Sequence, residues 1–140
     1  IGGQTVDVEL AGGPIPKDKL DFIYRLKTGA LIEASMLIGA VLGGAADQDC
    51  RIVESLASKL GLAFQIQDDI LDVAGDAAAT GKPAGSDARN KKTTYVTLEG
   101  LDKAKKEVER LSREAAEDLD KLGSNEFLES LIQYLAGREK

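Results

Sequence analysis

Apolar positions recur at intervals of three and four residues along most of this chain, which is the spacing of one face of an α-helix. The clearest run covers residues 101–122, where apolar side chains share one face and charged side chains the others. Gly123 follows as a signal for a helix C-terminus. A last helix is predicted over residues 127–135, and no Asn-Gly hairpin signal or internal repeat occurs. The pattern predicts an all-α protein whose residues 1–140 belong to one domain.

The first sixteen residues contain a short patterned segment and then a loop. Apolar and acidic residues alternate within residues 1–10 as they would in a strand, but the segment is short and isolated. We therefore favour the tail of a helix there. The Gly and Pro residues of segment 11–16 indicate a loop. Proline is well suited to the start of a helix, and Pro16 therefore predicts a helix from Lys17 onward.

Residues 28–46 form the most apolar stretch, in which Glu33 is the only charged residue. The length approaches the ~20 residues that a membrane span needs, but a carboxylate is costly at bilayer depth. We therefore expect no membrane span. The many Gly and Ala residues instead indicate a helix packed tightly inside a protein, or one with room for an apolar group alongside it. Residues 47–49 then offer N-caps for a long helix that we expect to end at Gly75.

This long helix carries a row of polar residues that we call the acidic stripe. Its members fall within about 100° of the helix circumference: Gln65, Asp68, Asp69 and Asp72. Apolar residues flank the stripe on both sides, and no Lys or Arg occurs between residues 59 and 82. Like charges one turn apart repel, and the spacing of these carboxylates suits Mg2+, which also binds phosphate oxygens. A solvated acidic patch is the alternative.

Composition narrows the possible functions. A chain of 140 residues that is 43% hydrophobic and 30% charged is typical of a globular domain. The net charge of −6 argues against non-specific nucleic-acid binding, and the absence of His excludes histidine catalysis by these residues. The single Cys50 cannot form an intrachain disulfide, so we expect a reducing, cytoplasmic compartment. Because the sequence begins with Ile1 and has no basic leader, we expect it to begin within a longer protein.

A basic loop is predicted directly after the acidic stripe. The Gly residues of segment 75–92 and Pro83 indicate a loop, and their spacing differs from that of a nucleotide-binding P-loop. Taken singly, its lysines are ordinary surface residues. If the loop folds across the acidic stripe, however, Lys82 and Lys92 would share a space with Lys27 and the carboxylates. Such a space suits a diphosphate that binds both cations and lysines.

Five motifs together resemble those of the all-trans isoprenyl diphosphate synthases, and they span nearly the whole chain. The acidic stripe, within residues 64–72, is similar to the second aspartate-rich motif of that family. Within the family, the short-chain enzymes that make farnesyl diphosphate are the most similar. The four other motifs occur in the family's order: Gly2-Gly3-Gln4 with Asp7, Lys27-Thr28, Gly81-Lys82 with Gly85 and Asp87, and Lys92-Thr93-Thr94-Tyr95.

The resemblance implies a fold and a reaction. The implied fold is a large all-α bundle around a deep cavity, usually in a homodimer, of which this chain would be the C-terminal half. The implied reaction is the Mg2+-dependent ionisation of an allylic diphosphate, dimethylallyl or geranyl diphosphate, followed by attack of isopentenyl diphosphate and loss of a proton. Its product would be farnesyl diphosphate.

The resemblance also implies roles for individual residues. It implies a magnesium site formed by three aspartates, of which the first is the principal ligand: Asp68, Asp69 and Asp72. Five residues would bind substrate: Lys27, Thr28, Gln65, Lys82 and Lys92. Among these, Lys27 and Lys82 would bind the allylic diphosphate, and Thr28, Gln65 and Lys92 would line the reacting end. The catalytic residues would be Lys27, Thr28 and Gln65.

Some features of the family are missing from this sequence. The family has an earlier aspartate-rich motif followed by arginines, and a group of Lys, Arg and His that binds isopentenyl diphosphate; neither is present. Val96 stands where many members have Pro. We therefore expect the chain to be part of a longer synthase and to be inactive alone. A non-catalytic helical partner or scaffold that keeps the synthase fold is the alternative.

Overall fold

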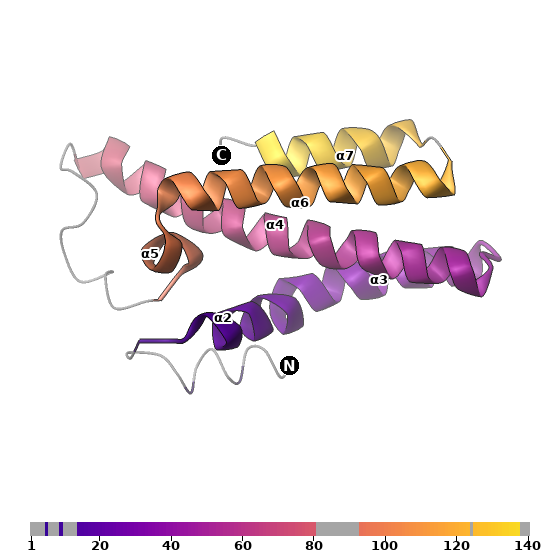
Figure 1. Cartoon of the computed structure of the whole chain (residues 1–140), viewed down its shortest axis with the longest axis horizontal. Coiled ribbons are helices and arrows are strands. Elements are labelled where there is room, and N and C mark those ends of the chain that lie inside the picture. The colour runs from indigo at the N-terminus through magenta and orange to yellow at the C-terminus, as the bar shows by residue number, and fades with distance from the viewer. Residues whose placement is uncertain (1–4, 6–8, 10–13, 81–92, 124, 138–140) are drawn as a thin grey trace.

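The computed structural model describes residues 5, 9, 14–80, 93–123 and 125–137, and within these parts every regular element is helical (Figure 1). The elements are α2 (Lys17–Tyr24), the π-helix η1 (Arg25–Gly29), α3 (Ala30–Leu42), α4 (Asp47–Thr80), α5 (Tyr95–Glu99), α6 (Leu101–Leu122) and α7 (Glu126–Gly137). The prediction of an all-α fold is confirmed.

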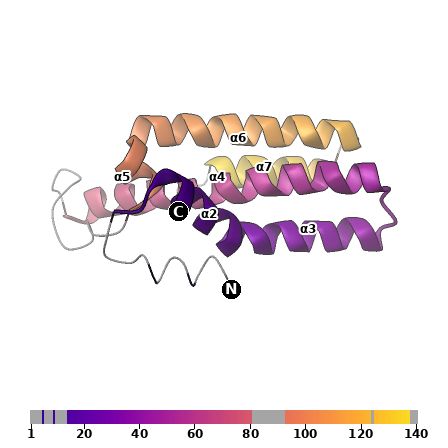
Figure 2. The same cartoon turned by 60° about the horizontal axis from the view of Figure 1, so that its bottom comes forward.

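Helix α4 lies between two layers of helices (Figures 1 and 2). Helices α6 and α7 pack on one side of it, and α2, η1 and α3 pack on the other. The larger buried cluster joins α2, α4, α5 and α6, and a smaller one joins α4, α6 and α7. The largest fully buried side chains are Ile23, Leu56, Leu60, Ile66 and Leu119. Burial of this apolar surface holds both layers to α4.

The predictions for α2 and α6 are confirmed. Helix α2 begins at Lys17, and the carbonyl of Pro16 accepts hydrogen bonds from the amides of Lys19 and Leu20 at 3.1 and 3.0 Å. Helix α6 ends immediately before Gly123, whose φ of 95° is a conformation that favours glycine. Local sequence signals were therefore sufficient to predict the start of α2 and the end of α6.

The predictions for both ends of α4 are wrong. Residues 47–49 do not cap the helix, because the amide of Cys50 donates to the carbonyl of Ala46 at 2.9 Å and so makes Ala46 the N-cap. Asp47 and Asp49 lie in the first turn, where negative charge interacts favourably with the helix dipole. Helix α4 also continues past Gly75 to Thr80. An internal Gly costs only about 1 kcal/mol, and the three alanines that follow are strong helix formers.

Helix α3 is the predicted apolar helix, but little of it is covered. It packs only against η1 and α4 among the described elements, and none of its residues is buried. The exposed fraction of Leu31, Ile38, Val41 and Leu42 ranges from 59% to 83%. The expectation of a helix packed tightly inside a protein is therefore not met within this chain. No described helix combines the length and apolarity that a membrane span requires.

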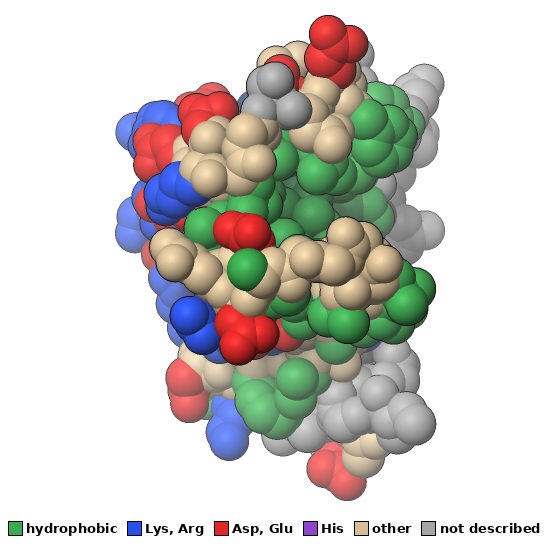
Figure 3. Space-filling view, turned by 90° about the vertical axis from the view of Figure 1, so that its right-hand side faces the viewer, with side chains coloured by type: hydrophobic (Ala, Val, Ile, Leu, Met, Phe, Trp, Pro, Cys, Tyr) green, Lys and Arg blue, Asp and Glu red, His purple; other side chains and the backbone are tan. Residues whose placement is uncertain are grey.

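Apolar side chains are also exposed at the end of the molecule where α3 ends and α7 begins. Figure 3 views this end and shows hydrophobic side chains over much of the face, with Lys and Arg along one edge. Phe127, in the first turn of α7, is 72% exposed. Large exposed apolar patches are typical of surfaces that contact another molecule.

Candidate functional site

The helix that runs from α2 into α3 widens at two of the predicted site residues. Lys27 and Thr28 lie in η1, a single π-helical turn, and both side chains are partly buried. A side chain on Gly29 would meet the carbonyl oxygen of Tyr24 at 2.9 Å, so glycine suits the widened turn. Single π-helical turns within α-helices occur frequently at functional sites.

Two glycines bring η1 into backbone contact with α4. A Cβ atom placed on Gly61 would lie 2.7 Å from the Cα atom of Gly29, closer than such atoms can approach. The absence of both side chains therefore permits the contact. At about 100° per residue, Gly61 has the direction of the acidic stripe and lies one turn before Gln65. The contact thus brings η1 to the beginning of the acidic stripe.

A polar contact joins α2, α4 and α5 at Asp69. The hydroxyl of Tyr24 donates a hydrogen bond to Oδ2 of Asp69, and the backbone amide of Tyr95 donates to the same oxygen at 2.9 Å. The Tyr95 amide also lies 3.4 Å from the Tyr24 hydroxyl oxygen. Both tyrosines are buried, with exposed fractions of 7% and 6%. One carboxylate oxygen therefore receives donors from two neighbouring helices.

The glycine contact and the tyrosine contact fix the direction of η1 relative to α4. Along α2 and η1 the tyrosine contact comes before the glycine contact, whereas along α4 it comes after. The two segments are therefore antiparallel. Lys27 and Thr28 lie between the contacts on one segment, and Gln65 lies between them on the other. The structure thus brings the π-helical turn alongside the acidic stripe.

The three aspartates of the acidic stripe have different surroundings. Asp69 faces Tyr24 and Tyr95, Asp68 is partly buried and Asp72 is exposed. In the parts of the chain that the structure describes, no group of three acidic or cysteine side chains could hold a metal ion. Asp68 and Asp72 are one turn apart on one side of α4, and Mg2+ usually takes one or two carboxylates together with substrate phosphates. The chemistry and spacing of these two residues suit magnesium, and magnesium binding by Asp68, Asp69 and Asp72 stays a prediction.

Residues 81–92 of the predicted basic loop lie outside the described residues, which resume at Thr93, whereas residues 75–80 belong to α4 and not to a loop. The proposed roles of Lys82 and Lys92 therefore stay predictions, as do those of the motif within residues 1–7. Thr93 is held near the start of α2, because its Oγ1 accepts a hydrogen bond from the amide of Ile15 at 3.0 Å.

The short helix α5 was not predicted from the sequence. Thr94 and Thr97 cap its first turn reciprocally, each side chain accepting a hydrogen bond from the backbone amide of the other residue. Lys17 packs over α5, with Nζ 5.2 Å from the centre of the Tyr95 ring and 3.3 Å from Oε1 of Glu99. Burial raises the pKa of the Tyr95 hydroxyl. These contacts hold α5 against α2, beside Asp69.

Sequence reasoning missed the residues that join these elements. In the sequence, Tyr24 belongs to an apolar helix stripe and Tyr95 to the motif that begins at Lys92. No local pattern indicates that both approach Asp69. Gly61 offered a signal, since it is the only Gly between residues 56 and 74. An isolated Gly within a helical pattern frequently has a packing reason.

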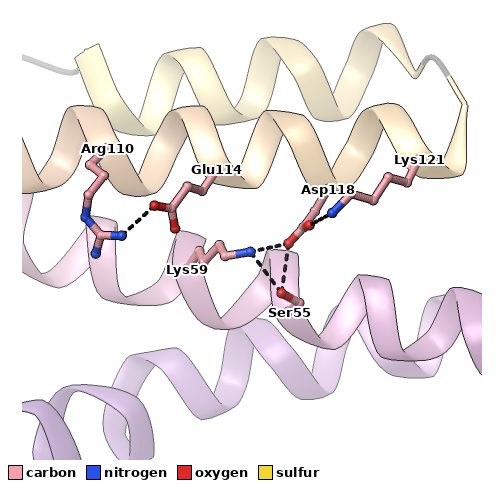
Figure 4. A network of polar contacts seen from close by, with 6 residues as sticks. All are labelled: Ser55, Lys59, Arg110, Glu114, Asp118 and Lys121. Carbon is pink, nitrogen blue, oxygen red and sulfur yellow. Dashed lines mark hydrogen bonds and ion pairs between the residues drawn. The ribbon is translucent and has the colours of Figure 1, made fainter.

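A second polar cluster holds α4 against α6 (Figure 4). Its centre is the buried carboxylate of Asp118, which accepts hydrogen bonds from Ser55 at 2.8 Å, from Lys121 at 2.6 Å and from Lys59. Burial would raise the pKa of Asp118, but these three donors outweigh burial and lower it to about 2. The carboxylate is therefore charged at neutral pH and satisfied on both oxygens.

Comparisons with known proteins agree on one family. A family model described as polyprenyl synthetase matches residues 1–134. The farnesyl diphosphate synthase of Escherichia coli (strain K12) is 41% identical over 146 residues, which cover 99% of this chain and 48% of that protein. The chloroplastic geranylgeranyl pyrophosphate synthase of Capsicum annuum is 39% identical over 142 residues, which cover 99% of this chain and 38% of that protein.

A solved structure is similar as well. The geranyltransferase from Helicobacter pylori, complexed with magnesium and isoprenyl diphosphate, superimposes with a TM-score of 0.72 at 32% identity. The superposition covers 95% of this chain and 44% of that one. This chain thus spans about half, or less, of the length of the proteins that it matches.

Proposed function

Because this chain belongs to the polyprenyl synthetase family, we propose that it forms the C-terminal half of a short-chain prenyltransferase. The proposed reaction joins isopentenyl diphosphate to dimethylallyl or geranyl diphosphate and yields farnesyl diphosphate. Similarity to a farnesyl diphosphate synthase supports this product, although geranylgeranyl pyrophosphate synthases are similar too. The homodimer and the cytoplasmic location stay predictions.

One observation supports the proposal: η1, which contains Lys27 and Thr28, packs antiparallel against α4 where the acidic stripe begins. An ammonium group and carboxylates on adjacent elements are a suitable arrangement for a diphosphate bound together with a divalent cation. Two of those carboxylates, on Asp68 and Asp72, lie one turn apart and fit magnesium.

Each of these residues then has a chemical task. Lys27 binds the allylic diphosphate with a charge-assisted hydrogen bond. Asp68 and Asp72 would hold Mg2+, which would supply positive charge against the negative charge that develops on the leaving diphosphate. The hydroxyl of Thr28 and the amide oxygen of Gln65 direct their negative ends toward the allylic cation that remains.

Bond making follows from that cation. The C–O bond of the allylic diphosphate breaks, and its electron pair leaves with the diphosphate. The double bond of isopentenyl diphosphate supplies the pair for the new C–C bond, and loss of a proton restores a double bond. Apolar side chains that flank the acidic stripe exclude water, which would otherwise capture the cation.

A non-catalytic helical partner or scaffold is the second candidate. The exposed apolar side chains of α3 favour it to the extent that they provide a surface for another helical segment. A synthase needs that surface as well, because the other half of its helical bundle would have to pack against this half. Only an activity that depends on the acidic stripe separates the two functions.

The test is prenyl transfer by a synthase that contains these 140 residues, measured with labelled isopentenyl diphosphate and geranyl diphosphate. We expect Asp68→Asn to lower kcat about a hundredfold, because stabilisation of the developing charge is lost. The matched control is Glu54→Gln, which removes an exposed carboxylate elsewhere on α4 and should leave the rate unchanged. The 140-residue chain alone should give no turnover.

Parent-like turnover of the Asp68→Asn variant would overturn the enzymatic proposal and favour the scaffold. The chain length of the product is read from the same reactions by chromatography. A product of fifteen carbons is expected, and a product of twenty carbons would overturn the farnesyl assignment while leaving the family's chemistry in place.

A further inference from the structure

We propose that Asp69 is a positioning residue, whose carboxylate fastens α2 and α5 to α4, and that it is not a metal ligand. The inference rests on the proposed function, because it assigns separate tasks to the aspartates of one predicted metal motif. Its basis is the contact at Oδ2 of Asp69, where the Tyr24 hydroxyl and the Tyr95 amide meet.

The direction of Asp69 on α4 separates it from the other two aspartates. At about 100° per residue, Asp68 and Asp72 lie about 40° apart around the helix. Asp69 lies about 60° beyond Asp72, at the edge of the acidic stripe nearest its tyrosine partners. Two carboxylates thus share one direction, and the third points in another, where Tyr24 and Tyr95 are its partners.

The partners of Asp69 oppose metal ligation through Oδ2. Both tyrosines are more than nine-tenths buried, and each donates to the same carboxylate oxygen. If that oxygen moved to a metal ion, the Tyr95 amide and the Tyr24 hydroxyl would lose a charged acceptor. Buried donors that lose their acceptor are costly, and hydrogen bonds to a charged group are the stronger kind.

The same contact positions a predicted substrate residue. Tyr24 is the last residue of α2, and Lys27 lies in the π-helical turn that follows it in one continuous helix. Fastening Tyr24 to α4 therefore fixes the backbone position from which the Lys27 side chain extends. Loosening this contact should weaken binding of the allylic diphosphate and leave the magnesium requirement as it was.

The kinetic test uses Tyr24→Phe and Asp69→Asn in a synthase that contains these residues. Phe keeps the ring without the hydroxyl, and Asn keeps a neutral acceptor of nearly the same shape. Each variant should raise KM for the allylic diphosphate about tenfold. Neither should change the magnesium concentration that gives half-maximal rate, whereas Asp68→Asn should raise it. The double variant Tyr24→Phe/Asp69→Asn should show less than the product of the two single effects, because both single changes act on the Tyr24–Asp69 hydrogen bond.

The structural test observes the Tyr95 amide in protein labelled with 15N-tyrosine, its cross-peak being identified by its loss in Tyr95→Phe. Loss of the charged acceptor in Asp69→Asn should move this peak upfield. Addition of MgCl2 and inorganic diphosphate to the parent should leave the peak in place.

The outcomes separate this inference from the proposed function. A parent-like rate and magnesium requirement in Asp68→Asn would overturn the proposed function, whatever Asp69 does. The inference alone is overturned if Asp69→Asn raises the magnesium requirement as Asp68→Asn does. It is also overturned if magnesium and diphosphate move the Tyr95 peak to its position in Asp69→Asn, or if Tyr24→Phe leaves KM unchanged.

Discussion

The contribution of a charged residue to the stability of this chain depends on how deeply the residue is buried. Arg110 pairs with Glu107 at 2.6 Å and with Glu114 at 2.5 Å, but its side chain is 44% exposed. Exposed pairs of this kind are usually worth less than 1 kcal/mol. Asp118 has a side chain that is only 7% exposed and is surrounded by donors from both α4 and α6. We therefore expect Asp118 to contribute more to stability than the exposed ion pairs of Arg110.

Replacing Asp118 by Ala should lower the free energy of unfolding at pH 7 by about 2–3 kcal/mol, because Ser55 and Lys59 lose a buried acceptor. The measurement is the urea midpoint, with an unchanged m-value as the sign that only stability has changed. The matched control is Glu109→Ala on the exposed face of α6, which should change stability by less than about 0.5 kcal/mol.

The same variant gives a pH dependence of known sign. The pKa of Asp118 is about 2 in the folded chain and about 3.9 when unfolded, so its stabilising contribution is complete above the unfolded value. The contribution is lost as pH falls toward 2. The difference between parent and Asp118→Ala should therefore shrink between pH 5 and pH 2. A difference that stays constant over this range would contradict the assignment.

The packing of whole elements depends on the π-helical turn and on the two glycines beside it. A π-helical turn holds about one residue more than an α-helical turn and so rotates the following helix by about 100°. The π-helical turn lies between α2, which buries Leu20, Ile23 and Tyr24, and α3, which buries none of its residues. The backbone contact at Gly61 then holds the turn against α4.

Gly61→Ala should push η1 away from α4, because the new Cβ atom would lie 2.7 Å from Gly29. We expect a loss of stability of about 1–3 kcal/mol and a fall in kcat in a synthase that contains the chain. Gly39→Ala is the matched control, since it adds the same methyl group to helix α3 with nothing within 4 Å. That control should stabilise the helix slightly. Equal urea midpoints for the two variants would show that the glycine contact is unimportant.

The helix layer that contains α3 is covered by α4 on one side and is left uncovered by the described elements on the other. Helix α3 contacts α4 and η1 through one side, while Leu31, Ile38 and Leu42 are each more than half exposed. The chain spans about half the length of its E. coli relative. These two facts agree with a surface that the rest of a synthase bundle would cover.

The 140-residue chain should therefore self-associate at micromolar concentration when it is studied alone. Analytical ultracentrifugation should detect species larger than the monomer, and Ile38→Glu together with Leu42→Glu should shift the distribution toward the monomer. Lys105→Glu, a change of charge on the exposed face of α6, is the control and should have little effect. A stable monomeric parent would contradict this expectation.

Local pattern was sufficient for much of this fold. Helices α2, α6 and α7 could be predicted because apolar spacing and end signals such as Pro16 and Gly123 act over a few residues. The acidic stripe could be predicted for the same reason, since one helix sets the directions of its own side chains. The end of α4 could not, because a run of alanines outweighed the signal of Gly75.

Contacts between helices could not be predicted from such local patterns. The meeting of Tyr24, Asp69 and Tyr95, and the contact between Gly29 and Gly61, join segments that are far apart along the chain. Those contacts exist because of how the helices pack, and packing depends on the shapes of all the surfaces that meet. Spacing along the chain therefore identified which side chains share a helix face, and the folded structure identified which of them touch.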